Sequence, residues 1–472
     1  MLNITGYDNA ERVFYYFEEI AKIPHGSGNC AKIADYIEEF AKSHGLEYLR
    51  DETDSLIVKK PATKGLEKKP PVALQGHIDM VIAKDEGVTK DMEKEGPDLY
   101  IDGDLIKARG TTLGADNGTA VAYMLALLES DDVPHPALEA IFTTDEETGL
   151  FGAKALDAAN IKSRLLINLD SDSEGELVAG CAGGIRVDSI LNFKKKKMPH
   201  ALARLTVSGL IGGHSGMEID KGRTNAIRAL AELLYGLPGL VISDFVGGTA
   251  TNAIPAYASA LIFTSEEEEL RERIKKTLAA LKTTEPEAKI DYQPNSAFKE
   301  VYGEEDSEKI LAMLLSMKNG VIEMHSEIDG LVETSQNLGV IKVDDEGIAL
   351  YGSVRSSKEK SKEEICKETE KLVKKYGGVC NFHENYPGWE YRTSSPLRDV
   401  AIRTYKEAFG KETKVKVIHA GLECGIFASK LEGLDAISMG PNAYDIHSTA
   451  ERLSISSFAR VWEHIKKILE EI

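Results

Sequence analysis

The sequence predicts an α/β protein in which a helix-covered, mainly parallel sheet is interrupted by an inserted α+β domain. From the N-terminus to about residue 185, helices alternate with short apolar strands, which is typical of a parallel sheet covered by helices. From about 186 to 385, alternating strands lie between strongly charged helices, which indicates a separate α+β domain. After about 386 the first pattern returns. A chain of 472 residues exceeds the size of one hydrophobic core, so two domains are expected.

The first segment, residues 1–185, is expected to supply most of the parallel sheet. Short apolar runs predict its buried strands, and apolar residues spaced three to four apart predict its helices. The strands are predicted at 72–75, 140–143 and 165–169, and the helices at 13–20 and 116–129, the second with an apolar face at Val121, Leu125 and Leu128.

The inserted segment is 186–385 and the last segment is 386–472. The same patterns predict strands at 203–207, 258–263 and 434–439, and helices at 266–281, 357–376, 396–409 and 455–472. The metal site inferred below requires the last segment to join the first in one domain, which makes the middle segment an insertion.

The composition excludes several classes of protein. A formal net charge of -20 would repel a phosphate backbone, so no nucleic-acid partner is expected. No apolar stretch reaches the length that spans a bilayer, and the N-terminus lacks the basic and then apolar layout of a signal peptide. The 5 cysteines are scattered without a close pair, which fits a reducing cytoplasm. We therefore expect a soluble cytoplasmic protein without a membrane partner.

Polar side chains follow the predicted strands of the first segment where each strand ends. In an open α/β sheet, ligands bind outside the carboxyl ends of the strands. The strand at 72–75 continues into Gly76-His77-Ile78-Asp79, and the two-residue period of a strand points His77 and Asp79 to the same side. An imidazole ligand beside a carboxylate that orients it is a common pair at a metal.

Acidic residues recur in three further motifs of the first segment. Gly114-Ala115-Asp116-Asn117-Gly118 presents a carboxylate where a helix begins, and the strand ends at 143–149 and 168–172 carry clustered acids. Each motif alone could be a turn, a solvated acid pair or a helix cap. Clustered carboxylates repel one another, and two divalent cations would turn that repulsion into coordination. The four motifs together, all at strand ends of one sheet, favour a metal site.

These motifs and the final Asp445-Ile446-His447-Ser448-Thr449-Ala450-Glu451 resemble the zinc-dependent aminoacylase, carboxypeptidase and dipeptidase family of metallopeptidases. Within that family the chain is most similar to the aminoacyl-histidine dipeptidases, also called cytosolic non-specific dipeptidases. The resemblance covers essentially the whole chain. It implies that the first and last segments form a catalytic domain and that the insertion is a lid domain.

The resemblance implies two metal sites, residue by residue. His77, Asp116 and Asp170 would be three of the ligands, Glu147 and His447 would complete the two sites, and Asp116 would bridge both cations. Zinc is the expected metal, although such sites also accept manganese or cobalt. The aspartate at 170 matches the peptidase branches, whereas many deacylases of the family place a glutamate there. A cis peptide bond directly after Asp116 is implied as well.

The same resemblance gives two more acids a role beside the metals. Glu146 would be the general base, which takes a proton from the attacking water and delivers it to the leaving amine. Asp79 would hold His77 in the right tautomer. Cys424 lies close to His419 in the sequence and could suggest a thiol nucleophile, but the metal ligands favour a buried thiol.

Substrate contacts are implied for the insertion and for one loop of the last segment. His214, within Gly212-Gly213-His214-Ser215-Gly216, would reach the scissile carbonyl and stabilise the oxyanion. Asn252 and Arg355 match positions that contact the substrate, with Arg355 on its terminal carboxylate; Arg355 could equally be an ordinary cation at a strand end. Glu423 would bind the free amino group or make a structural hydrogen bond.

The sequence therefore predicts a dinuclear metal-dependent dipeptidase that hydrolyses unblocked dipeptides, with Xaa-His dipeptides among the candidates. A tripeptidase or an N-acyl amino acid hydrolase with the same metals is the nearest alternative. A non-catalytic peptide-binding homologue is the alternative from another class, and the presence of Glu146 with all the candidate ligands favours catalysis. Members of the family are often homodimers, so a homodimer is expected.

Overall fold

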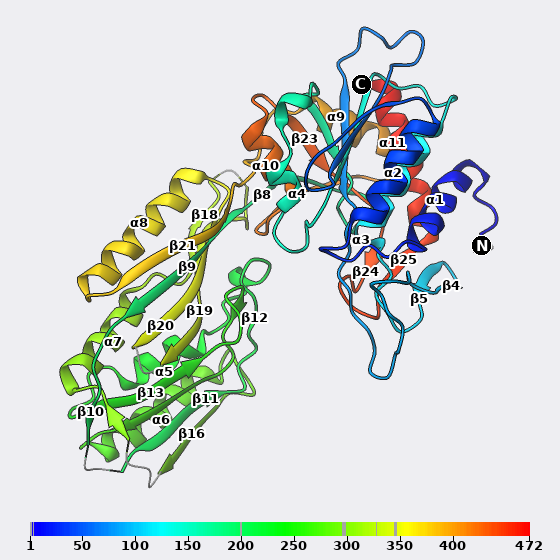
Figure 1. Cartoon of the computed structure of the whole chain (residues 1–472). Helices are drawn as coiled ribbons and strands as arrows, with labels where there is room; N and C mark the ends of the chain where they lie inside the picture. Colours follow the sequence, from blue (N-terminus) through cyan, green and yellow to red (C-terminus); the bar gives the residue numbers. More distant parts are fainter. Residues whose placement is uncertain (1, 3, 199–200, 295–298, 327, 344–346) are drawn as a thin grey trace. The chain divides into compact units, whose positions relative to one another are not determined.

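The computed structural model describes residue 2 and residues 4–198, 201–294, 299–326, 328–343 and 347–472. The chain divides into two compact units (Figure 1). Unit 1 comprises Met1–Cys181, Trp389–Val417 and Leu422–Ile472, and unit 2 comprises Ala182–Gly388 and Ile418–Gly421. The sequence placed the boundaries at 185/186 and 385/386 and assigned 418–421 to the last segment. This short stretch belongs to unit 2 instead, where the carbonyl of Ile418 accepts the backbone N–H of Ala182 at 3.0 Å.

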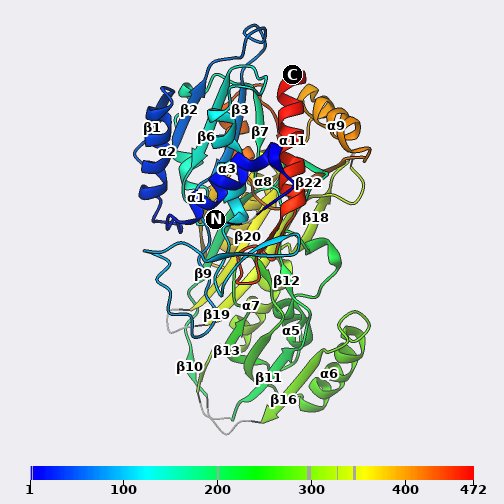
Figure 2. The same ribbon diagram turned by 90° about the vertical axis from the view of Figure 1, so that its right-hand side faces the viewer.

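Unit 1 is built on an eight-stranded sheet (Figure 2). Its order is β1 (Glu47–Arg50), β2 (Leu56–Lys60), β6 (Leu138–Thr143), β3 (Val72–His77), β7 (Leu165–Asn168), β23 (Asp435–Ser438), β8 (Glu176–Cys181) and β22 (Lys414–Ile418). The central strands β6, β3, β7 and β23 are parallel. β1 and β2 on one flank and β8 on the other join antiparallel. The mixed sheet with a parallel centre confirms the predicted α/β class.

Unit 1 contains seven α-helices among the described residues, and α9 shows most clearly how the sequence marks both ends of a helix. They are α1 (Glu11–Ala21), α2 (Ala31–Ser43), α3 (Ala115–Glu129), α4 (Phe151–Ala155), α9 (Pro396–Phe409), α10 (Glu423–Lys430) and α11 (Ile455–Glu471). In α9 the hydroxyl of Ser395 accepts the N–H of Arg398 at 3.0 Å, Pro396 opens the first turn, and Gly410 ends the helix at a φ of 65°. A side-chain cap and a proline in the first turn commonly mark the start of a helix, and a glycine with a positive φ commonly marks its end.

The core of unit 1 lies around α3. An apolar face at Val121, Leu125 and Leu128 was predicted, but every side chain from Asn117 to Leu128 is buried. A helix that is apolar on all sides belongs inside a core, and α3 packs against both α1 and β3. Its N-terminus, which carries Asp116, is thereby held in place.

A second, four-stranded sheet of unit 1 supports the last motif. Its order is β24 (Ala443–Tyr444), β25 (Arg452–Ser454), β5 (Leu105–Ala108) and β4 (Leu99–Asp102). The loop between β24 and β25 carries His447 and Glu451, and the antiparallel pairing of Tyr444 with Arg452 closes that loop. The chain end is thus tied to the segment that precedes α3.

Unit 2 is built on a nine-stranded sheet with helices against it. The order is β16 (Lys289–Pro294), β11 (Ala203–Ser208), β15 (Ala258–Phe263), β13 (Val241–Gly247), β19 (Val332–Val343), β20 (Ile348–Ser356), β9 (Gly183–Leu191) and β21 (Val379–Tyr386), and β18 (Gly320–Met324) pairs with β19. The helices are α5 (Ala226–Leu234), α6 (Glu267–Leu281), α7 (Glu304–Ser316) and α8 (Glu359–Lys375), and two small sheets pair β10 (Lys196–Lys197) with β17 (Glu300–Val301) and β12 (Gly213–His214) with β14 (Ala253–Ile254).

The two faces of the sheet in unit 2 differ in polarity. Val354 of β20 packs against Ile365 of α8. Since successive side chains of a strand point to opposite faces, Arg355 lies on the face away from α8. Its antiparallel partner on β19 is Ser335, and the next pair on that face is Asn337 with Ser353. This face therefore presents polar side chains.

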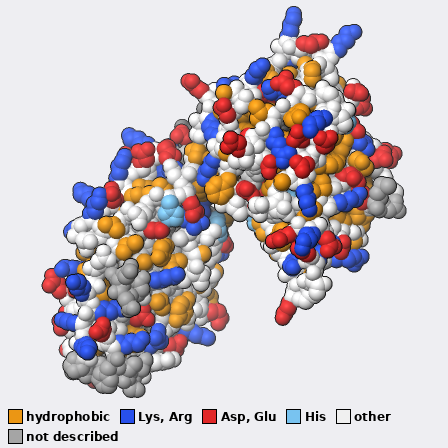
Figure 3. Space-filling model, viewed as in Figure 1, with side chains coloured by type: hydrophobic (Ala, Val, Ile, Leu, Met, Phe, Trp, Pro, Cys, Tyr) orange, Lys and Arg blue, Asp and Glu red, His pale blue; other side chains and the backbone are white. Residues whose placement is uncertain are grey.

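Charged side chains of both signs are mixed over the visible surface of each unit (Figure 3). Within the described residues, no helix combines the length and the apolar character needed to cross a membrane.

Candidate metal centre and substrate-binding residues

The parallel strands of unit 1 end at one edge of the sheet. In the strand register His77, the last residue of β3, lies beside Thr143, the last residue of β6, and Gln75 lies beside Asn168 at the end of β7. The segments that follow these strands therefore leave the sheet together. They carry Asp79, Glu146, Glu147 and Asp170 next to His77. Asp116 comes instead from the start of α3, and His447 from the loop between β24 and β25.

The structure brings the predicted metal ligands together. Among the described residues there are three groups in which each residue offers a ligand atom and these atoms lie within 4.8 Å of one another. The groups are His77 with Asp116 and Asp170, His77 with Glu146 and Glu147, and Asp116 with Glu147 and His447.

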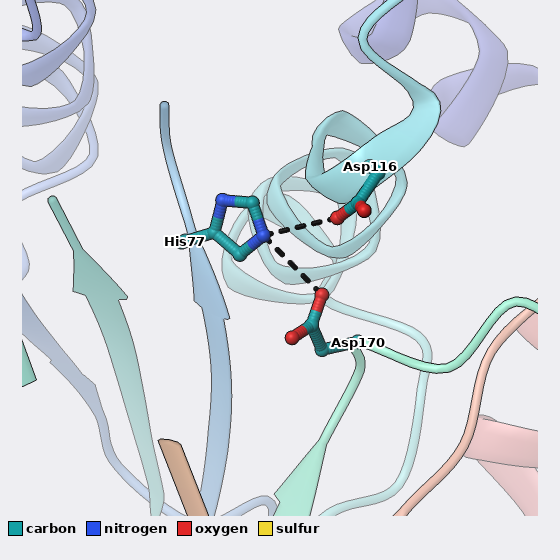
Figure 4. A group of neighbouring side chains, drawn as sticks. All are labelled: His77, Asp116 and Asp170. Carbon is teal, nitrogen blue, oxygen red and sulfur yellow. Dashed lines mark hydrogen bonds and ion pairs between the residues drawn. The ribbon is translucent and has the colours of Figure 1, made fainter. Parts of the chain in front are cut away.

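His77 is the centre of the first group (Figure 4). Its Nε2 lies 3.0 Å from Oδ1 of Asp116 and 3.3 Å from Oδ1 of Asp170. Its Nδ1 lies 3.0 Å from the carbonyl oxygen of Asp79. A carbonyl only accepts, so Nδ1 carries a proton, and in the neutral ring Nε2 keeps the lone pair that a metal ligand needs.

Asp79 ties His77 to the loop after β6. The carboxylate is buried, and its Oδ1 lies 3.4 Å from Nδ1 of His77. It accepts the N–H of Glu146 at 3.1 Å and the hydroxyl of Ser27 at 2.8 Å. Burial raises the pKa of Asp79, but the hydrogen bond and charge of His77 outweigh burial and hold it below its usual value. Asp79 is thus an ionised support for the loop that carries Glu146.

Asp116 faces both metal groups. While Oδ1 points to His77, Oδ2 lies 3.1 Å from Nε2 of His447, and the same nitrogen lies 2.9 Å from Oε1 of Glu147. One carboxylate shared by two sets of ligands is the arrangement that a bridging ligand requires. The peptide bond between Asp116 and Asn117 is cis, as the family resemblance implied.

Glu451 positions Asp116 and was not predicted to do so. Its buried carboxylate accepts the N–H groups of Leu113 at 2.7 Å, Gly114 at 3.0 Å, Ala115 at 2.8 Å and Asp116 at 3.3 Å. These amides lead into the N-terminus of α3, where a carboxylate is electrostatically favoured. The sequence signal was only that Glu451 closes the His447 motif.

Without cations, the cluster holds protons. Burial lowers the pKa of His77, but the charge of Asp170 and the hydrogen bonds of Asp116 and Asp170 raise it well above its usual value. Hydrogen bonds to Asp116 and Glu147 raise the pKa of His447 to about 10. Burial, with the charges of Asp116 and Glu147, raises the pKa of Asp170 to about 7. Positive charge is therefore required here, and divalent cations would supply it in place of the protons.

The donor set fits a pair of such cations. Imidazole nitrogen and carboxylate oxygen are the ligands that zinc, manganese and cobalt accept. Each group offers one imidazole and two carboxylates, which leaves positions for water or substrate, as catalytic sites require.

Glu146 stands at the edge of this cluster as a half-buried carboxyl. Burial and the charges of Asp170, Glu423 and Glu147 raise its pKa well above the usual value of a glutamate, although the charge of His77 opposes them. A carboxyl that takes up a proton readily beside a ligand cluster is suited to proton transfer.

Glu423 lies beneath the strand ends with no exposed surface. Its Oε2 accepts hydrogen bonds from Gln75 and, at 2.7 Å, from the hydroxyl of Thr143. The oxygen of Gln75 accepts the amide of Asn168 at 2.6 Å, and Asn168 accepts the N–H of Asp170 at 3.3 Å. A buried chain of hydrogen bonds thus runs from Glu423 to Asp170, one of the predicted ligands. Oε2 of Glu423 makes this structural hydrogen bonding, whereas its buried Oε1 has no hydrogen-bond partner among the described residues.

The predicted substrate residues of the insertion lie in unit 2. The backbone of Asn252 is held because Asn337 donates to the carbonyls of Thr251 and Ala253 at 3.0 and 2.8 Å. His214 pairs with Ala253 in the strand register of β12 and β14. These contacts bring the His214 and Asn252 segments together on the polar face.

Arg355 lies on that same face without a carboxylate partner among the ion pairs of the described residues. Its Nη1 donates to the hydroxyl of Tyr386 at 2.9 Å, and its buried Nε has no hydrogen-bond partner. Its neighbour in register, Ser335, contacts Nε2 of His419 at 2.7 Å. A guanidinium surrounded by neutral donors and acceptors is suited to bind an anion from outside the chain.

Cys424 has none of the properties of a nucleophile. The thiol is fully buried in unit 1, and burial raises its pKa well above the usual value. A reactive cysteine requires a stabilised thiolate. The structure therefore agrees with the buried thiol that the sequence favoured.

Comparisons with known proteins identify relatives along the whole chain. Residues 73–471 match the description of Peptidase family M20/M25/M40. The cytosol non-specific dipeptidase of Escherichia coli strain K12 is 36% identical over 469 residues, which cover 97% of this chain and 96% of that protein. The aminoacylhistidine dipeptidase of Vibrio alginolyticus superposes with a TM-score of 0.91 at 34% identity, over 98% of this chain and 96% of that one. The aminopeptidase PepT of Bacillus cereus ATCC 10987, at a TM-score of 0.57, 20% identity and 99% coverage of both chains, shares the fold.

Proposed function

This chain belongs to peptidase family M20/M25/M40, and from that membership we propose that it is a dinuclear metal-dependent dipeptidase that hydrolyses unblocked dipeptides. Two full-length relatives at 36% and 34% identity are named as dipeptidases, and one of them as an aminoacylhistidine dipeptidase. Xaa-His dipeptides are accordingly the first substrates to consider. The observation that carries the proposal is the carboxylate of Asp116, whose two oxygens face two histidines.

We assign five side chains to the two cations. His77 and Asp170 would hold one, Glu147 and His447 the other, and Asp116 both. When bound, the cations would polarise the scissile carbonyl and lower the pKa of the attacking water. Zinc is the metal proposed, with manganese or cobalt compatible with the same donors.

Glu146 is proposed as the general base. Its carboxylate would take a proton from the attacking water and return it to the nitrogen of the leaving amine. The backbone of Glu146 is held by Asp79, so that the same aspartate that orients His77 also places the base. The raised pKa of Glu146 matches a group that must hold the proton between the two transfers.

Recognition of the substrate is assigned to unit 2. Arg355 would bind the terminal carboxylate, Asn252 the backbone of the dipeptide, and His214 the carbonyl oxygen as negative charge develops on it. For Glu423 we propose a supporting role beneath the strand ends in place of the predicted contact with the amino group, because the side chain is fully buried and its Oε2 is engaged by Gln75 and Thr143.

The setting proposed for the enzyme is a cytoplasmic homodimer. The name of the Escherichia coli relative places that protein in the cytosol. The dimer rests on the family resemblance, and sedimentation of the purified protein would test it.

A panel of substrates tests the proposed reaction. The purified, metal-loaded protein is given unblocked dipeptides that include Xaa-His, tripeptides, and N-acyl amino acids, each with and without a chelator. Chelator-sensitive hydrolysis that is fastest with dipeptides is expected. Preferred cleavage of tripeptides or N-acyl amino acids would move the protein to another branch of the family. If no member of the panel is hydrolysed, the non-catalytic peptide-binding protein remains as the alternative.

A further inference from the structure

The segment 212–218, called here the His214 turn, fixes which nitrogen of its histidine carries a proton. Nδ1 of His214 accepts the backbone N–H of Gly216 at 3.2 Å and that of Met217 at 3.1 Å. A backbone N–H can only donate, so Nδ1 must present its lone pair. In a neutral imidazole the proton then resides on Nε2.

The surroundings of the ring favour this neutral form. Burial and the positive charge of Arg355 lower the pKa of His214, against a smaller opposing effect of Glu218. The nearby imidazole of His419, on which the charge of His214 acts, has its own pKa lowered to about 3 by burial and by the charge of Arg355. Protonation of Nδ1 would in addition break both backbone hydrogen bonds.

Glu218 holds the turn in this shape. Its Oε2 accepts the backbone N–H of His214 at 2.9 Å, its own N–H donates to the carbonyl of His214 at 3.0 Å, and its Oε1 accepts from Arg223. Arg223 also donates to the carbonyl of Gly212. The carboxylate therefore binds the amide of His214 directly and is linked to the carbonyl of Gly212 through Arg223.

Two glycines of the motif are explained by the same contacts. A Cβ on Gly213 would lie 1.9 Å from Nη1 of Arg223 and 2.4 Å from Oε2 of Glu218. A Cβ on Gly216 would lie 2.6 Å from the carbonyl oxygen of His419. All three distances are too short for a real carbon. At Gly216 the obstacle is a backbone oxygen, and at Gly213 it is the Arg223 and Glu218 side chains that hold the turn, so a side chain at either position would disturb the turn.

We propose that the His214 turn holds His214 as a neutral imidazole with its proton on Nε2, and that Glu218 is the positioning residue that maintains this form. The tautomer follows from the contacts of the turn alone. Only the use of its N–H, to stabilise the oxyanion of a peptide substrate, rests on the proposed function. A fixed N–H aimed at an oxyanion stabilises it without reorganisation during the reaction. The proton stays on Nε2, since the proton transfers are assigned to Glu146.

The tautomer can be observed directly in the full-length protein. Histidines are labelled with ¹⁵N in the imidazole ring, the protein is loaded with diamagnetic zinc, and long-range ¹H–¹⁵N correlations are recorded at neutral pH. The signal that disappears in His214→Gln identifies the residue. A protonated Nε2 with an unprotonated Nδ1 is expected. A proton on Nδ1, or on both nitrogens, overturns the proposal whether or not the protein hydrolyses dipeptides.

Variants of Glu218 test its positioning role, with the exposed Glu232 of α5 as the matched control. Glu218→Ala removes the acceptor and is expected to mix the tautomers of His214 and to lower kcat about tenfold or more with little change in KM. Glu218→Gln keeps an acceptor and is expected to retain the Nε2 proton. Glu232→Ala should match the wild type in both readouts. A wild-type spectrum and kcat in Glu218→Ala, or loss of the Nε2 tautomer in folded Glu218→Gln, would exclude Glu218 from this role.

Discussion

The carboxylate of Glu451 accepts the backbone N–H of Asp116 at 3.3 Å, across 335 positions of sequence. It binds the three preceding amides as well. The segment that presents Asp116, the proposed bridging ligand, is therefore anchored by a residue from the far end of the chain. This relationship leads to the first prediction.

Glu451→Ala should weaken metal binding while the protein stays folded. Removing the acceptor leaves four amides at the start of α3 without a partner and loosens the segment that presents Asp116. Loss of such outer support typically costs about 10–100-fold in metal affinity. Activity measured against buffered free zinc should shift by that amount and recover at excess zinc. The exposed Glu470→Ala of α11 is the control, and an unshifted zinc titration of Glu451→Ala would contradict this role.

The variants Glu146→Gln and Glu147→Gln should show which of these two neighbouring acids transfers protons and which one binds metal. The first keeps shape but cannot accept the proton of the water, so turnover should vanish while zinc content stays that of the wild type. The second removes a ligand, so zinc should be lost from one site. Atomic absorption on both dialysed proteins provides the comparison. Reduced zinc in Glu146→Gln would make Glu146 a ligand, and normal activity would remove it from the mechanism.

Arg355→Lys should raise KM for a dipeptide about tenfold or more, because a lysine cannot make the two parallel hydrogen bonds of a guanidinium. KM for the matching dipeptide amide, which lacks the carboxylate, should change little. Tyr386→Phe should act in the same direction, since its hydroxyl accepts from Arg355 at 2.9 Å. Arg271→Lys, on the helix α6 beside Glu267, is the control. An equal rise of KM for the dipeptide and for the dipeptide amide would argue against recognition of the terminal carboxylate by Arg355.

Metal binding should release protons. With pKa values of about 10 for His447 and well above the usual value for His77, both imidazoles are protonated at neutral pH in the metal-free protein. Cations need their lone pairs, so loading should release about two protons or more per chain. Metal affinity should accordingly fall as pH falls. A pH indicator in weakly buffered solution measures the release, and zinc uptake without released protons would contradict the cluster described here.

The residues that follow the strands could be predicted to lie together, because the carboxyl ends of parallel strands lie at the same edge of a sheet. The family membership expected from the motifs after β3, β6 and β7 is confirmed. The ends of those strands share one register, so residues distant in sequence had to meet at one edge. For the same reason the His77 motif and the acids at 143–149 and 168–172 could be assigned to one site. The Asp116 motif was wrongly placed at a strand end of that sheet, because it opens α3 after β5 of the four-stranded sheet.

The features that could not be predicted from the sequence depend on contacts between distant segments, which leave no pattern in the local sequence. Glu451 reads as an ordinary acid after a loop, and only folding shows that it caps the segment before α3. The hydrogen-bond chain from Glu423 through Gln75 to Asn168 joins three segments that are distant in the sequence. The local sequence around Gln75 or Asn168 does not predict that its amide makes these buried hydrogen bonds. The burial of α3 on all sides likewise depends on α1 and the sheet together rather than on its own apolar face.

Anomalous diffraction from crystals of the zinc-loaded protein would locate the two proposed cations. Two zinc peaks are predicted about 3.5–4 Å apart, as in other two-metal sites. Asp116 should lie between them, with His77 on one peak and His447 on the other. A single peak at full zinc occupancy, or two peaks that Asp116 does not bridge, would contradict the dinuclear site on which the account rests.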